Sequence, residues 1–184
     1  DLEARFLDCT ATWHPADLVP DMDQGGDVLI VDGSRALLDR VPVVTPDENG
    51  LDVTFAVDLR SDGGADIRQI RRPRGNAAVG LRSALATEPS RRREGVERSL
   101  VPLFGPLTLG DIQASDPMQL DEPVHLTVDL QVGALGQRSG PNWQLPSMFG
   151  RDPLLSLPLI DKEKRTQPLL LAPAYHQRRG LRRP

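Results

Sequence analysis

The sequence has little of several things, and each shortage excludes a class of protein. With one cysteine among 184 residues, no internal disulfide can form, which excludes a disulfide-stapled scaffold. Aromatic residues make up 4% of the chain, few for the base-stacking surfaces of nucleic-acid-binding proteins. No stretch approaches the roughly 18 consecutive apolar residues of a transmembrane helix. The sequence has no CxxC, HExxH or glycine-rich phosphate motif.

Neither sign of charge dominates. The 22 Lys plus Arg and 26 Asp plus Glu give a formal net charge of −4 and a pI near 5.4, which argues against a protein that coats nucleic acid. The basic clusters are Arg91–Arg93 and Arg178–Arg183, and Glu94 and Glu97 dilute the first. We expect a solvated helix face and a loose tail there, with an anionic protein surface left open as a partner and no nucleic acid.

Alternating apolar and polar residues predict two long strands, at Leu51–Leu59 and at Val124–Val132. Asn49-Gly50 is a turn signal before the first strand, and Ser61–Gly64 turns it into a returning strand over Asp66–Arg71. Shorter apolar runs predict further strands. These runs lie at residues 1–8, 27–31 (a buried strand), 41–45, 107–115, 143–148, 154–160 and 168–172.

The spacing of apolar residues becomes helical after Gly75. It predicts helices over Ala77–Thr87 and Arg91–Phe104, separated by Pro89, with Ser90 as the N-cap of the second. Strands, a helical pair, then strands again predict an α+β, mainly β fold. We expect an antiparallel sheet or sandwich with a two-helix insertion near residues 76–104.

The opening segment Phe6–Ala11 (FLDCTA) resembles the end of the transglutaminase-like core, where a strand finishes in a hydrophobic–Asp–Pro–Thr signature. Cys9 stands where proline is usual. Later stretches resemble the β-rich region that follows the core in large bacterial transglutaminase-like proteins. These stretches are 18–25, 28–31, 45–49, 75–82, 120–124 and 165–171.

This resemblance implies that residues 1–12 are the last strand of such a core and that 13–175 form a β-rich accessory domain. The polar segment 176–184 is expected to be a flexible basic tail. Asp1 is not an initiator methionine and no signal peptide follows it, so we expect the chain to be a fragment, a cleaved product or an excised domain of a longer protein. Bacterial proteins of this type are often exported, so the resemblance favours an extracytoplasmic location.

The resemblance also implies a role for Asp8. The superfamily uses a Cys–His–Asp triad, in which Asp8 would be the third member and would hold the His tautomer. The Cys and His would lie upstream of Asp1, so this chain alone is expected to be non-catalytic. Its parent would be an acyltransferase or a cysteine peptidase. The alternative is a strand-end Asp that satisfies local backbone donors.

Two other groups of residues invite a chemical interpretation. Cys9 with the nearby His14 is a second arrangement for a nucleophile, weighed against an inert cysteine. Asp21, Asp23, Asp27 and Asp32 partly match the spacing of a calcium loop. Calcium is therefore a hypothesis, weighed against a polar loop entering a strand; no other cofactor is expected.

Two functions follow. The first is a non-catalytic accessory domain that packs on an upstream transglutaminase-like core and positions a protein substrate. The second is an independent β-sandwich that binds carbohydrate or a partner protein.

Overall fold

The computed structural model describes residues 5–147 and 176–182, and strands dominate these ranges. The strands and helices follow one another in this order: β1 (Asp27–Asp32), β2 (Arg35–Arg40), β3 (Gly50–Leu59), β4 (Ala65–Arg74), α1 (Asn76–Leu85), α2 (Pro89–Phe104), β5 (Leu107–Ala114), β6 (Leu126–Val132), β7 (Gln137–Ser139), β8 (Asn142–Gln144) and β9 (His176–Arg182).

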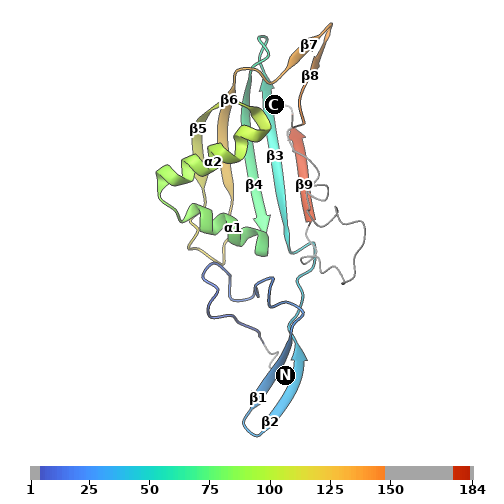
Figure 1. The fold of residues 1–184 in the computed structure, drawn as a ribbon, viewed down its shortest axis with the longest axis vertical. Coiled ribbons are helices and arrows are strands. Elements are labelled where there is room, and N and C mark those ends of the chain that lie inside the picture. Colours follow the sequence, from blue (N-terminus) through green and yellow to red (C-terminus); the bar gives the residue numbers. More distant parts are fainter. Residues whose placement is uncertain (1–4, 148–175, 183–184) are drawn as a thin grey trace, which may run out of the picture.

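The main sheet contains, among the described residues, five strands in the order β5-β6-β4-β3-β9. Neighbouring strands are antiparallel except that β9 runs parallel to β3. Both helices cover one face of this sheet (Figure 1). The expected α+β, mainly β class with a two-helix insertion is therefore confirmed, in the form of a sheet with helices on one side.

The core lies between the sheet and the helices. Every second residue of β6 faces it, from Leu126 to Val132, and each of these is at most 3% exposed. Phe55 of β3 and Phe104 of α2 meet edge to face with ring centroids 5.6 Å apart. The period-two pattern that predicted β3 and β6 thus reflects one buried face and one open face.

The helices begin slightly earlier than the sequence predicts. Ser90 as the N-cap of α2 is wrong, because the helix starts at Pro89 and Glu88 takes the cap position without a side-chain cap bond. Proline suits the first helical position since its φ is already helical and its missing N–H would have had no partner there. Arg93 of α2 donates to the carbonyls of Leu109 and Gly110, which ties the helix to β5.

The expectation of a loose tail after His176 is wrong for residues 176–182, which form β9. Backbone groups along β3 pair with this segment from Gly50↔His176 to Ala56↔Arg182. A strand at a sheet edge is held by main-chain hydrogen bonds, so few apolar side chains are needed. Residues 5–8 and 41–45 are not strands. The runs at 154–160 and 168–172, and residues 1–4, lie outside the described residues.

β1 and β2 form a hairpin that projects from the sheet, and Figure 1 shows it extending beyond one end of the molecule. We call residues 27–40 the β1–β2 arm. The strand expected at 27–31 is confirmed, but its expected burial is wrong, because Leu29 is 64% exposed and Val31 68%. Apolar composition predicted a strand without specifying what covers it.

Candidate functional site

Asp8 lies in a local turn. Its Oδ1 accepts a hydrogen bond from the backbone N–H of Thr10 at 2.8 Å and another from the Thr10 hydroxyl at 2.7 Å. These bonds, the hydroxyl bond above all, hold the pKa of Asp8 below its usual value. Asp8 is half-buried and its carboxylate is fixed in orientation by these bonds; it satisfies a local backbone donor, as the alternative from the sequence expected, but it does not end a strand.

Cys9 and His14 are not brought together as a nucleophile and its base. Cys9 is exposed, whereas the His14 ring is directed to α1, where its Nε2 lies 3.0 Å from Asn76 Oδ1. Asn76 uses its Nδ2–H to reach the carbonyl of Val19, so its Oδ1 accepts from the imidazole. His14 therefore fastens the N-terminal segment to the start of α1.

The four aspartates of the calcium hypothesis are spread along the chain. Asp21 and Asp23 lie in a turn, and Asp27 and Asp32 stand at opposite ends of β1, about 17 Å apart at the rise of a strand. Burial raises the pKa of Asp21. Within residues 5–147 and 176–182, no group of three or more His, Cys, Asp or Glu side chains is placed to hold a metal ion.

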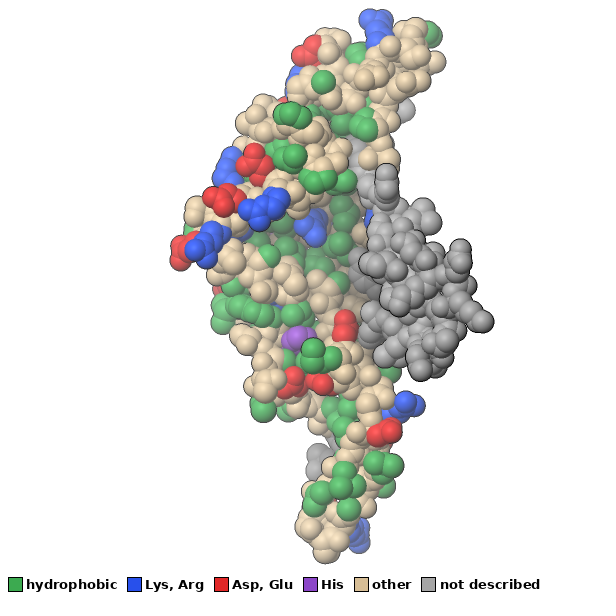
Figure 2. All heavy atoms as spheres, in the orientation of Figure 1, with side chains coloured by type: hydrophobic (Ala, Val, Ile, Leu, Met, Phe, Trp, Pro, Cys, Tyr) green, Lys and Arg blue, Asp and Glu red, His purple; other side chains and the backbone are tan. Residues whose placement is uncertain are grey.

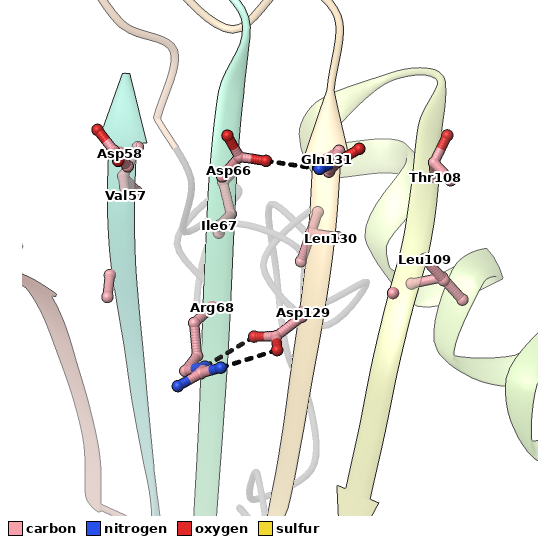
Figure 3. Close-up of a pocket in the computed structure, with 12 residues that line it drawn as sticks. Val57, Asp58, Asp66, Ile67, Arg68, Thr108, Leu109, Asp129, Leu130 and Gln131 are labelled. Atoms are coloured by element: carbon pink, nitrogen blue, oxygen red, sulfur yellow. Dashed lines mark hydrogen bonds and ion pairs between the residues drawn. The ribbon is translucent and has the colours of Figure 1, made fainter. Parts of the chain in front are cut away.

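The open face of the main sheet, away from the helices, carries a hollow of about 560 Å³ (Figure 3). Arg68 and Asp129 bridge its centre from neighbouring strands with two parallel hydrogen bonds of 2.7 and 2.8 Å. Asp66 accepts from Gln131 at 2.8 Å and from Arg60 at 3.0 Å. We call this surface the open-face hollow.

Small residues keep the hollow open. Ala56 of β3 lies opposite Arg68 of β4. Gly110 of β5 lies beside Asp129, and a Cβ added to Gly110 would be 3.2 Å from the Asp129 carbonyl oxygen. Asp58 faces Asp66 directly across β3 and β4. Chemically, the hollow presents carboxylates and an amide to a polar ligand, and no aromatic ring is among the described residues that line it.

The Arg68–Asp129 pair gives a testable pH dependence. Hydrogen bonds from Arg68 hold the pKa of Asp129 below its usual value, outweighing the opposite effect of desolvation. The stability that the ion pair contributes is therefore fully present above the pKa of Asp129 in the unfolded chain, near 4. It is lost as the pH falls through the lower pKa of Asp129 in the folded protein. Asp129→Asn is expected to lower the free energy of unfolding by up to about 1 kcal/mol at neutral pH and by less at pH 3, which is below the unfolded pKa.

Urea unfolding at the two pH values measures this difference. The double variant Arg68→Gln/Asp129→Asn serves as the control, because it removes both charges. It should lose little more stability than either single variant does. An Asp129→Asn effect of equal size at both pH values would show that the ion pair is not its cause.

Arg82 on α1 is a buried cation that the sequence analysis missed. It is 3% exposed, and its guanidinium donates to four backbone carbonyls of the β5–β6 connection, those of Pro117, Gln119, Leu120 and Glu122. Burial lowers the pKa of Arg82, while Asp121 acts in the opposite sense. Arg82 lies four residues after Ala78 and three before Leu85, so all three share one face of α1. This spacing was the signal in the sequence that Arg82 is buried.

The β1–β2 arm exposes apolar side chains on both of its faces. Leu29 pairs with Leu38 on one face, and Leu37 lies on the other. Leu37 is 62% exposed and Leu38 70%, and Figure 2 shows hydrophobic side chains along this projection. The base is anchored, since Arg40 Nε donates to the Gly25 carbonyl at 2.7 Å. Such a surface is typical of an interaction site.

Together these features define an α+β domain with a projecting apolar hairpin and no assembled catalytic cluster in its described part. A scan against protein-family models finds no matching family, and searches of curated proteins and of solved structures find no match. Neither α1 nor α2 has the length and apolarity needed to cross a membrane.

Proposed function

We propose that this chain is a non-catalytic accessory part of a transglutaminase-like protein that packs on the catalytic core and positions a protein substrate. The observation that carries the proposal is the β1–β2 arm, whose leucines are exposed on both faces. The resemblance of Phe6–Ala11 and the later stretches to that family supplies the identity of the core. The arm supplies a surface to meet it.

The energetics of the arm support a covered state. A two-stranded hairpin is marginally stable by itself in water, and Leu29 and Leu38 leave most of their area to solvent. Covering the exposed parts of these two side chains would contribute about 2–3 kcal/mol. A partner that encloses the arm therefore stabilises both the hairpin and the assembly.

The arrangement around Asp8 supports a non-catalytic role for this chain alone. Asp8 has an oriented, ionised carboxylate, while His14 is engaged with Asn76 rather than with Cys9. In the proposed assembly, the nucleophilic cysteine and the histidine come from upstream of Asp1. Asp8 then orients that histidine.

The alternative is an independent binding module. If its ligand is a partner protein, the exposed β1–β2 arm supports this function as well. For a carbohydrate, the support is limited to the polar groups of the open-face hollow, such as Asp66 and Gln131. The two functions differ in whether the arm's partner belongs to the same polypeptide.

The test uses the double variant Leu29→Ser/Leu38→Ser. Its stability is measured both in the complete product of the gene that encodes this chain and in the 184-residue chain. In the complete protein, thermal unfolding and limited proteolysis should reveal a loss of about 2–3 kcal/mol, because the buried leucines lose their apolar contacts. In the 184-residue chain, the five-stranded sheet should keep its stability within about 0.5 kcal/mol.

Met118→Ser is the matched control, because Met118 is 65% exposed outside the arm. Met118→Ser should change the stability of neither the complete protein nor the 184-residue chain. Equal stability of the complete protein with and without the arm substitutions would contradict packing on a core. Loss of a separate bound protein instead would support the independent module.

A further inference from the structure

A groove runs between α1 and α2 above the main sheet, with a volume of about 290 Å³. Its floor is apolar and comes from three elements: Leu81 and Leu85 of α1, Val96 of α2 and Leu126 of β6. Figure 2 faces this side and shows hydrophobic side chains in the depression between the two helices. We call it the helix groove.

One wall of the helix groove, on α2, includes a glycine. Gly95 lines the groove, and a Cβ built on it would meet no atom within 4 Å. An ordinary side chain at this position would extend into free space without displacing its neighbours. A side chain larger than glycine at position 95 therefore has room to extend beside the groove without displacing another residue.

The charged groups at the groove, in the part of the chain that the structure describes, are cationic. Arg71 of β4 and Arg91 and Arg92 of α2 line it, and the lining residues within 5–147 and 176–182 include no Asp or Glu. The Arg92 guanidinium spans the turn between the helices by donating from Nη2 to the carbonyls of Leu85 and Thr87. Its Nε is buried and has no hydrogen-bond partner. An apolar floor beside cationic guanidinium groups is complementary to an amphiphilic anion.

We propose that the helix groove binds a linear alkyl carboxylate of the size of octanoate, with its chain on Leu81, Leu85 and Val96 and its carboxylate beside Arg91 and Arg92. At about 30 Å³ for a water-sized group, the volume fits about ten non-hydrogen atoms, the number in octanoate. Guanidinium groups favour carboxylates because their N–H donors match the two oxygens. This site goes beyond the accessory role proposed above and does not depend on it.

Calorimetric titration of the 184-residue chain with octanoate tests the proposal, with octylammonium and octanol as probes of the same chain length. Octanoate should bind saturably, and both other probes should bind at least about tenfold more weakly because they lack the negative charge. Arg91→Gln should weaken octanoate binding about fivefold, since one cation is lost while Arg92 remains.

Gly95→Leu is the decisive variant. The leucine would occupy the groove, and replacing glycine within a helix favours folding, so binding should be abolished in a protein at least as stable as the parent. Gly80→Leu is the matched control, because an added Cβ at Gly80 also meets no atom within 4 Å and Gly80 does not line the groove. Its octanoate affinity should be unchanged.

Three results would overturn the proposal. The first is that octanoate shows no saturable binding up to about 10 mM, a dissociation constant that corresponds to a binding free energy of about −3 kcal/mol. The second is that octylammonium binds as tightly as octanoate. The third is that Gly95→Leu leaves the octanoate affinity unchanged. Because none of these readouts involves the arm or acyl transfer, failure here leaves the proposed function untouched.

Discussion

Replacing Arg82 by methionine is expected to lower the free energy of unfolding by about 3–5 kcal/mol. The methionine retains much of the buried apolar stem, but the carbonyls of Pro117, Gln119, Leu120 and Glu122 lose their donor. Each abandoned buried acceptor costs about 1–3 kcal/mol, and water reaching the loosened connection recovers part of that sum. Urea unfolding followed by circular dichroism measures the loss.

The controls separate the hydrogen bonds from the charge and from helix propensity. Arg98→Met makes the same exchange at an exposed position of α2, so it should change stability by less than about 0.5 kcal/mol. Arg82→Lys keeps a cation but replaces the planar fork by a single ammonium, and about half of the loss should remain. If Arg82→Met matched Arg98→Met, the carbonyl contacts would contribute no net stability.

The same contacts explain why Arg82 matters beyond α1. The carbonyls that it binds belong to the connection between β5 and β6, so one side chain fixes the path between two neighbouring strands of the sheet. Amide hydrogen exchange in Arg82→Met should therefore increase first in residues 117–122, before the exchange of β6 itself.

The central fold was predictable because its signals are local. β3 and β6 alternate strictly, and the helical spacing of Leu81, Leu85, Val96 and Leu100 identifies the two helices without knowledge of their partners. β9 could not be predicted in this way. Its partner β3 lies more than a hundred residues earlier in the chain, and main-chain pairing leaves little trace in side-chain polarity.

The candidate surfaces show the same limit. Arg68 and Asp129 are 61 residues apart in sequence, so only the sheet register places them in one hollow. The first strand of the arm was predicted at 27–31 but β2 was not, and the exposure of the first strand was missed because an apolar run such as Val28–Val31 does not specify what covers it. The aspartates of the calcium hypothesis had a loop's spacing, but from Asp27 to Asp32 the backbone is a strand that separates them.

In the complete protein, Asp8→Asn is expected to lower kcat/KM for acyl transfer by on the order of 10³-fold, if Asp8 completes the proposed triad. Asparagine has the same shape, and its amide oxygen can still accept both hydrogen bonds from Thr10, so the turn should be preserved. What is lost is the negative charge that stabilises a histidinium and selects its tautomer. Amine incorporation into a glutamine-containing peptide measures the effect.

Asp17→Asn is the control, because it removes an exposed carboxylate from the same N-terminal segment and should leave kcat/KM unchanged. Thermal unfolding of the Asp8→Asn protein should match that of the parent, which distinguishes loss of chemistry from loss of structure. Acyl transfer that survives Asp8→Asn at full rate would remove Asp8 from the triad. The arm substitutions would then test separately whether this chain packs on the proposed core, since the proposed burial of Leu29 and Leu38 does not depend on the charge of Asp8.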